Sequence, residues 1–213
     1  MEPLDRPGRR LALGLTLAGT ALFYLLAATV RRSSRLWIDV EGQRLAFGHV
    51  LGVSIMSFRL ASELVRLGTT AFFLSSVAIL VVAALTLRDR LSATVALLAA
   101  PVAVLATEKI GKPLIGRQEG HGYGFPSGHT TVIATVVAIL ALIAYREWHW
   151  RGLAVVAPVA LVVPLMAVAV VRVNFHRFSD SVGGILVGFG TVLGIAWLVS
   201  MAVLAWRRPT RVP

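Results

Sequence analysis

Cysteine is absent from the 213-residue chain, and charged residues are scarce. The lack of cysteine excludes disulfide bonds and thiolate chemistry, and it leaves the compartment open on redox grounds. Aspartate, glutamate, lysine and arginine together make up 15% of the sequence, whereas about a quarter is usual in soluble domains. Hydrophobic residues make up 57%, and the mean hydropathy is +0.80. This composition predicts an integral membrane protein.

Acidic residues are also few: there are 10 of them against 21 lysines and arginines, which gives a formal charge of +11. A charge of this size is compatible with nucleic-acid binding, but the basic residues form short groups between apolar stretches and no continuous stripe. We therefore expect a membrane with anionic lipids as the partner, and no nucleic acid. Most of the arginines would then only orient the chain in the bilayer.

Six apolar stretches are long enough to cross a hydrocarbon core of about 30 Å as helices of about 20 residues. The first stretch is flanked by arginine pairs and is too long for a signal-peptide core, so we expect an uncleaved span. No repeat or second domain is visible, which predicts a single domain over residues 1–213. The predicted fold is an all-α polytopic membrane helix bundle with six transmembrane helices, at about 11–30, 68–87, 91–108, 129–145, 152–171 and 181–206.

An even number of spans places both termini on one side of the membrane. The termini and the short turns at 88–90 and 146–151 are much richer in arginine than the long connections. The positive-inside rule therefore predicts cytoplasmic termini and long connections that face outward from the cell membrane. In the connection 31–67, apolar residues recur among polar ones, which is typical of an amphipathic interfacial helix that serves as a lid or only packs.

Ionisable residues near membrane depth are costly, so they are candidate functional groups. The first cluster leads into a helix start, where Ser127 is a suitable N-cap, Gly128 lets the backbone approach a ligand, and His129 falls in the first turn. Lys112 and Arg117 precede this start and add positive charge suited to phosphate oxygens. These features indicate an anion site with a titratable group. A basic loop before a capped helix is also typical of an interfacial anchor.

The second cluster precedes the last span and pairs a base with an acid. His176 and Asp180 are four residues apart, so they lie one turn apart if the helix begins early. A carboxylate in that place would hold the imidazole in one tautomer and raise its basicity, as a nucleophile or a general base requires. Taken alone, the segment also fits an aspartate cap beside a histidine hydrogen-bonded at the interface.

Together the two clusters resemble the type 2 phosphatidic acid phosphatases, relatives of glucose-6-phosphatase and of the vanadium haloperoxidases. The family motifs are Lys-x6-Arg-Pro, Pro-Ser-Gly-His and Arg-x5-His-x3-Asp; the second is intact at 126–129, and His-x3-Asp is intact at 176–180. By this resemblance His176 is the nucleophile, Asp180 activates it, and His129 protonates the leaving oxygen. The resemblance also implies a phosphate-binding set of Lys112, Arg117, Ser127, Gly128 and Arg172.

The chain departs from the family motifs at two arginines. The arginine position of the first motif holds Glu119, and that of the third motif holds Val170. The nearest arginines, Arg117 and Arg172, would then reach the phosphate from shifted positions, with Arg177 as a second candidate. Glu119 would be unfavourable beside an anion unless it points away or contacts a particular headgroup.

We therefore expect a lipid phosphatase of a bacterial inner membrane that hydrolyses a lipid phosphate or diphosphate at the outer face. The resemblance implies a phosphohistidine intermediate, with no metal and no cofactor. Phosphatidic acid, phosphatidylglycerol phosphate, polyprenyl diphosphate and a polyprenyl phosphosugar phosphate share the terminal group that the site would bind. The choice among them is open, as is the oligomeric state. His121, in the glycine-rich loop, is either a substrate contact or a simple loop residue.

Three other functions would use the same residues. A transporter or flippase would use the charges to move an anionic headgroup, and phosphate release by the purified protein would reject it. A metal enzyme would use His129, His176 and Asp180 as ligands, and full activity after chelation would reject it. Haloperoxidase activity follows from the shared motif, but those relatives are soluble proteins and this chain is not.

Overall fold

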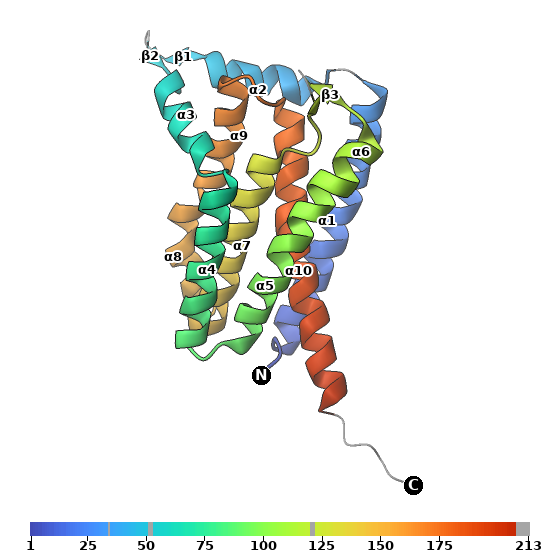
Figure 1. The fold of residues 1–213 in the computed structure, drawn as a ribbon, viewed down its shortest axis with the longest axis vertical. Helices are drawn as coiled ribbons and strands as arrows, with labels where there is room; N and C mark the ends of the chain where they lie inside the picture. The colour runs from blue at the N-terminus through green and yellow to red at the C-terminus, as the bar shows by residue number, and fades with distance from the viewer. Residues whose placement is uncertain (34, 51–52, 120–121, 208–213) are drawn as a thin grey trace.

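The computed structural model describes residues 1–33, 35–50, 53–119 and 122–207, which form a bundle of long helices. The N-terminus and the last described residues lie at one end of the bundle, and a short helix, α2, lies across the other end (Figure 1). In chain order the helices are α1 (Arg6–Arg32), α2 (Trp37–Phe47), α3 (Phe58–Arg66), α4 (Thr70–Thr86), α5 (Arg90–Leu105), the π-helix η1 (Ala106–Gly111), α6 (Lys112–Ile115), α7 (Gly128–Trp148), α8 (Trp150–Ala160), α9 (Val162–Arg172) and α10 (Phe178–Trp206).

The helices account for the predicted spans. Within the described residues, five helical segments are long and apolar enough to cross a membrane, and the pair α3 and α4, which meet at 55°, makes a sixth if it counts as one span. The five segments are Arg6–Arg32, Arg90–Ile115, Gly128–Trp148, Trp150–Arg172 and Phe178–Trp206. The predicted all-α polytopic bundle is confirmed.

The third span is longer than predicted. Helix α5 continues through η1 into α6, so the helical segment runs to Ile115 rather than to residue 108. The prediction stopped where the apolar sequence stops, at Glu108 and Lys109. The helix continues beyond that point, and Glu108 and Lys112 both face a cavity.

The connection between the first two spans contains two short helices, α2 and α3. Between them lies an antiparallel hairpin of β1 (His49–Val50) and β2 (Val53–Ser54), and a second hairpin of β3 (Gln118–Glu119) and β4 (Gly122–Tyr123) follows α6. Helix α2 packs against α9 and α10 and buries Asp39, Gly42 and Ala46 on that side. The segment is therefore packed onto the end of the bundle.

Small residues let α7 and α10 approach each other closely. A Cβ atom on Gly184 would lie 2.2 Å from the Oγ1 atom of Thr130, and one on Gly188 would lie 2.7 Å from the Cβ atom of Ala134. Small residues at such contacts are the usual basis of close helix packing in membranes. Because the two helices cannot separate without losing this contact, their first turns have a fixed relative position.

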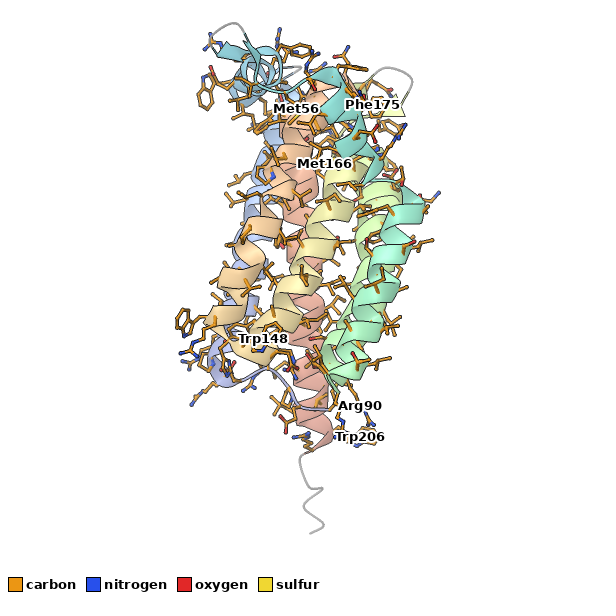
Figure 2. All side chains as sticks on the ribbon, turned by 90° about the vertical axis from the view of Figure 1, so that its left-hand side faces the viewer. Met56, Arg90, Trp148, Met166, Phe175 and Trp206 are labelled. Carbon is orange, nitrogen blue, oxygen red and sulfur yellow. The ribbon has the colours of Figure 1, made fainter. Side chains whose placement is uncertain are left out.

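The two ends of the bundle carry different side chains. Trp148, Arg90 and Trp206 lie toward the end that holds the termini, and Met56 and Phe175 lie at the other end (Figure 2). Trp148 and Trp206 are 56% and 91% exposed, as tryptophans at a membrane interface commonly are.

Candidate active site

The two motif clusters lie together at the end of the bundle away from the termini, where α7 and α10 both begin (Figure 1). His129 is the second residue of α7, and His176 lies in the turn between α9 and α10. Their imidazole centroids are 6.2 Å apart. The backbone N–H of Ser127 donates to the carbonyl of Asp180 at 2.9 Å, which ties the two helix starts together. The structure thus brings together residues from clusters about 50 positions apart in the sequence.

Both histidines line a cavity of about 260 Å³. Its charged wall contains Glu108 and Lys112 in addition to the histidines, and the rest of the lining is mostly apolar or small. A few polar groups that converge beside an apolar wall are typical of a ligand site. The remaining lining residues are Gly68, Thr70, Phe73, Val104, Thr107, Gly128, Thr131 and Val132.

Lys112 reaches the cavity already paired with an acid. Its Nζ atom lies 2.7 and 2.8 Å from the two carboxylate oxygens of Glu108. A Cβ atom on Gly128 would lie 2.6 Å from one of these oxygens, so the carboxylate also sits against the start of α7. The sequence predicted Lys112 and Gly128 at an anion site, and the structure places an anionic side chain between them. Glu108 itself was not predicted; its position four residues before Lys112 was the available signal.

Ser127 occupies the N-cap position of α7, as predicted, but its hydroxyl makes no capping bond. The side chain is fully buried, and the Oγ atom has no hydrogen-bond partner among the described residues. The Ser127 carbonyl accepts hydrogen bonds from the hydroxyls of Thr130 and Thr131, at 3.2 and 2.9 Å. A buried hydroxyl without a partner is costly, and Ser127 stands directly before Gly128 and His129, which line the histidine cavity, without lining it itself.

Asp180 faces His176 across a gap. The Oδ2 atom of Asp180 is 3.8 Å from Nδ1 of His176, which is longer than a hydrogen bond. The same Oδ2 atom accepts a bond of 3.0 Å from the backbone N–H of Arg177. Helix α10 begins at Phe178, so the histidine lies just outside it and not one helical turn below the acid. Nδ1 of His176 is buried and has no hydrogen-bond partner in the described part of the chain.

Arg117 lies apart from the histidine cavity. Its guanidinium donates to Oδ1 of Asp180 at 2.8 Å and to the hydroxyl of Ser179 at 2.6 Å. A third bond, of 3.1 Å, runs to Oδ2 of Asp39 on α2. All four side chains are buried. The resemblance implied that Arg117 contacts phosphate, whereas the structure directs its guanidinium at two carboxylates.

Asp39 was not identified from the sequence. It lies in the segment that the sequence describes only as amphipathic, 78 residues before its arginine partner. Burial alone would raise the pKa of Asp39, but hydrogen bonds from backbone N–H groups, from the Ser179 side chain and from Arg117 hold this pKa below its ordinary value. The carboxylate is therefore charged at neutral pH.

Arg172 also points away from the cavity that the histidines share. Its Nε donates to the carbonyl of Met56 at 3.1 Å. The guanidinium carbon lies 4.8 Å from the ring centre of Phe47 and 5.9 Å from that of Phe58. Arg172 thus joins α9 to α2 and α3, which differs from the phosphate contact that the resemblance implied.

A second cavity, of about 300 Å³, lies on the other side of His176. Arg177 and Glu119 both line it, and their Nε and Oε2 atoms are 2.9 Å apart. Glu119 therefore faces an arginine and does not line the cavity that contains Lys112. The other lining residues are Arg35, Asp39, Gln43, Val171 and Asn174. His121 lies outside the described residues.

The arrangement supplies two imidazoles, an ammonium group and free backbone at a helix start, on one cavity. Such a set suits transfer of a phosphoryl group, which needs a nucleophile, a proton donor and positive charge for the oxygens. Within the described ranges, no three histidine, aspartate or glutamate side chains converge as a metal site.

Comparisons with known proteins agree on one family. A family model described as the PAP2 superfamily matches residues 15–204. The fold is similar to the crystal structure of a transmembrane PAP2-type phosphatidylglycerolphosphate phosphatase from Bacillus subtilis, with a TM-score of 0.66 and 17% sequence identity. That match covers 92% of this chain and 98% of the other. No curated protein sequence matches the chain.

Proposed function

The chain belongs to the PAP2 superfamily, and from this premise we propose that it removes a terminal phosphate from a lipid through a phosphohistidine at His176. Family membership and the apolar bundle make it a multi-pass membrane protein and a lipid phosphatase. The observation that carries the proposed mechanism is the shared cavity, in which His129 and His176 face one space together with Lys112.

In the first step, the neutral imidazole of His176 attacks the phosphorus atom through Nε2. A phosphorus–nitrogen bond forms while the bond from phosphorus to the lipid oxygen breaks. His129 donates a proton to that oxygen, so the lipid leaves as an alcohol, or as a phosphate ester if the substrate is a diphosphate. Asp180 balances the positive charge that the His176 ring acquires, since its carboxylate lies 3.8 Å from Nδ1.

In the second step, water attacks the phosphorylated histidine. His129, now neutral, accepts a proton from the water, the phosphorus–nitrogen bond breaks, and inorganic phosphate leaves. The histidine regains its neutral form, and His129 is protonated again for the next turnover. No step uses a metal ion or a cofactor.

Lys112, Ser127 and Gly128 are suited to hold the phosphoryl oxygens. The ammonium lies on the cavity wall, the buried Ser127 hydroxyl has a hydrogen to donate, and Gly128 begins a helix whose free N–H groups and positive end attract anions. Glu108 must release Lys112 when the phosphate binds, because both anions compete for the same ammonium.

The apolar residues of the same cavity are suited to the first part of a lipid chain. Phe73, Val104 and Val132 line it beside the charged groups. Phosphatidic acid, phosphatidylglycerol phosphate, polyprenyl diphosphate and a polyprenyl phosphosugar phosphate all combine such a chain with a terminal phosphate, and these are the proposed substrates. The arginine-rich end of the bundle supports the proposal that the termini are cytoplasmic and that the site faces outward.

Phosphate release from a panel of these lipids by the purified protein in detergent tests the proposal. The His176→Ala variant should release none. A matched control is His149→Asn at the opposite end of the bundle, since His149 has a φ of 50° that asparagine tolerates. Normal turnover by His176→Ala, or no release from any lipid by the unmodified protein, would contradict the proposed function.

A further inference from the structure

We infer that Asp39 of the surface helix α2 is a positioning residue for catalysis, which acts on His176 through Arg117 and Asp180. This inference rests on the proposed function, because it assigns Asp39 a part in preparing the nucleophile. The cavity that the two histidines share contains none of Asp39, Arg117 and Asp180. None of the three therefore lines the space proposed for the lipid phosphate, although Asp39 lines the second cavity together with His176.

Asp39 contacts two groups that hold Asp180 in place, the backbone of Ser179 and the guanidinium of Arg117. Its Oδ1 atom accepts a bond of 2.8 Å from the backbone N–H of Ser179, the residue that precedes Asp180 in the first turn of α10. Its Oδ2 atom accepts the 3.1 Å bond from Arg117, whose other terminal nitrogen holds Oδ1 of Asp180 at 2.8 Å. One carboxylate on α2 thus fixes the backbone and the side-chain partner of the acid that faces His176.

The charges of the group explain why a second carboxylate is useful. Arg117 alone would neutralise Asp180, and its full attraction would draw that carboxylate away from the histidine. Asp39 shares the guanidinium, so the buried group of two acids and one arginine keeps a net charge of −1. A net negative charge beside His176 stabilises the positive ring that forms when the histidine attacks.

Close packing of Gly42 against Phe178 also fixes helix α2 at this point. A Cβ atom on Gly42 would lie 2.2 Å from the Cβ atom of Phe178, the first residue of α10. Gly42 is one turn after Asp39, so the close contact and the hydrogen bonds fix the same face of α2 against the same turn of α10. The helix that lies across the end of the bundle in Figure 1 is therefore joined directly to the support of the nucleophile.

Other charged groups also face His176, and the test must take them into account. His129 lies on one side with Lys112 and Glu108, and Arg35, Glu119 and Arg177 line the second cavity on the other. Replacing Asp39 with asparagine changes the charge of the supporting group by one and leaves all of these in place. The acid limb of the pH–rate profile should then move to lower pH, because less negative charge favours the neutral, reactive form of the imidazole.

The test compares Asp39→Asn with Asp89→Asn in the purified full chain. Asp89 is a matched control, since it is also a buried acid paired with an arginine, Arg146 at 2.8 Å, at the opposite end of the bundle. We expect both variants to unfold at lower temperature. Only Asp39→Asn should lower kcat, by about 10- to 100-fold with little change in KM, and shift the acid limb.

Equal kcat values and equal pH profiles for the two variants would overturn the inference and leave Asp39 a structural residue. If Asp39→Asn does not fold, Gly42→Ala is the second variant, because it displaces α2 at Phe178 and keeps every charge. That variant should lower kcat and leave KM unchanged, and an unchanged kcat would overturn the inference. The activity of His176→Ala is measured in parallel. Turnover by His176→Ala would reject the proposed function. If His176→Ala is inactive and Asp39→Asn has normal kinetics, only the role of Asp39 is rejected.

Discussion

The carboxylate of Glu108 holds the ammonium of Lys112 with both oxygens, at 2.7 and 2.8 Å, on the wall of the cavity that the two histidines share. A carboxylate in that place resembles the phosphate that the site is proposed to bind. Each substrate or product phosphate must displace it, and the strength of this internal ion pair therefore sets part of the affinity for phosphate.

Replacing Glu108 with glutamine should make inorganic phosphate a stronger inhibitor. The neutral amide does not compete for Lys112, so we expect the inhibition constant to fall about tenfold, the effect of one charge-assisted hydrogen bond. Steady-state inhibition by phosphate measures it. Glu63→Gln is the control, because Glu63 pairs with Arg66 at 3.1 Å on exposed α3. Weaker inhibition in Glu108→Gln would mean that the glutamate orients the lysine for phosphate.

Replacing His176 and replacing His129 with alanine should have different effects on turnover and on labelling. His176→Ala should abolish both turnover and labelling by a substrate with radioactive terminal phosphate. His129→Ala should slow turnover by about 100- to 10,000-fold, the usual contribution of a general acid, and still accept label from a substrate whose leaving group needs no proton. A quench without acid, followed by peptide mapping, locates the label. Acid-labile, base-stable label at a residue other than His176 would contradict the scheme, as would an activity profile that is not bell-shaped with pH.

Replacing Arg117 and replacing Arg172 with alanine should have different effects on stability and activity, because the environments of the two side chains differ. Arg117→Ala leaves two buried carboxylates without their shared guanidinium, which should cost about 3 to 5 kcal/mol of folding free energy and most of the activity. Arg172→Ala loses one hydrogen bond and two ring contacts, so we expect a cost of about 1 to 2 kcal/mol and near-normal kcat. Thermal unfolding and kinetics on both variants make the comparison. A large loss of kcat in a stable Arg172→Ala protein would restore its predicted phosphate contact.

The contribution of Asp39 to folding stability should persist at mildly acidic pH. Since the folded-state pKa of Asp39 is lowered, its contribution to stability is complete above the unfolded pKa of about 4 and is lost only as the pH falls through the lower folded value. The difference in unfolding temperature between the unmodified protein and Asp39→Asn should therefore stay constant from pH 8 to pH 5. It should shrink below about pH 4. A difference that already shrinks between pH 7 and pH 5 would argue against the lowered pKa.

The orientation in the membrane can be tested with single cysteines, because the chain has none of its own. Gln118 and Glu147 are both exposed and lie at opposite ends of the bundle. In intact cells, Gln118→Cys should react with an impermeant thiol reagent, and Glu147→Cys should react only after the membrane is opened. The reverse pattern would place the site on the cytoplasmic face.

The fold was predictable because each span leaves a continuous local signal. About 20 apolar residues are needed to cross the bilayer, and the sequence shows where they begin. The first turn of α7 was also predictable, since His129 follows a recognisable helix start. The last span was predicted from residue 181, whereas α10 begins at Phe178 and includes Asp180. The end of the third span was not, because hydropathy reports which side chains face lipid and not where the backbone stops being helical.

The buried ion pairs that support the site could not be predicted from the sequence, for a different reason. Arg117 and Asp39 are 78 residues apart, and no local pattern links an acid in an amphipathic stretch to an arginine after the third span. A displaced family arginine suggested a shifted phosphate contact, but buried acids on α2 and α10 decide where the guanidinium lies. Glu108 is the opposite case, since an acid four residues before a lysine is a local pair that periodicity alone could have identified.

The π-helix η1 in the third span decides on which side of the helix Lys112 lies. A residue of an α-helix turns the chain by about 100°, and a π-turn accommodates one residue more than an α-turn. If the same residues formed a regular α-helix, Lys112 would follow Thr107 by five residues and would lie about 140° from it around the helix axis, away from the wall that the two residues now share. Thr107 would stay in place, because its hydroxyl is bonded to that of Thr131 at 3.1 Å. Alignment of this chain with other phosphatases should therefore match helical turns rather than residue counts, since the π-turn accommodates one extra residue and still keeps Lys112 on the cavity wall beside Thr107.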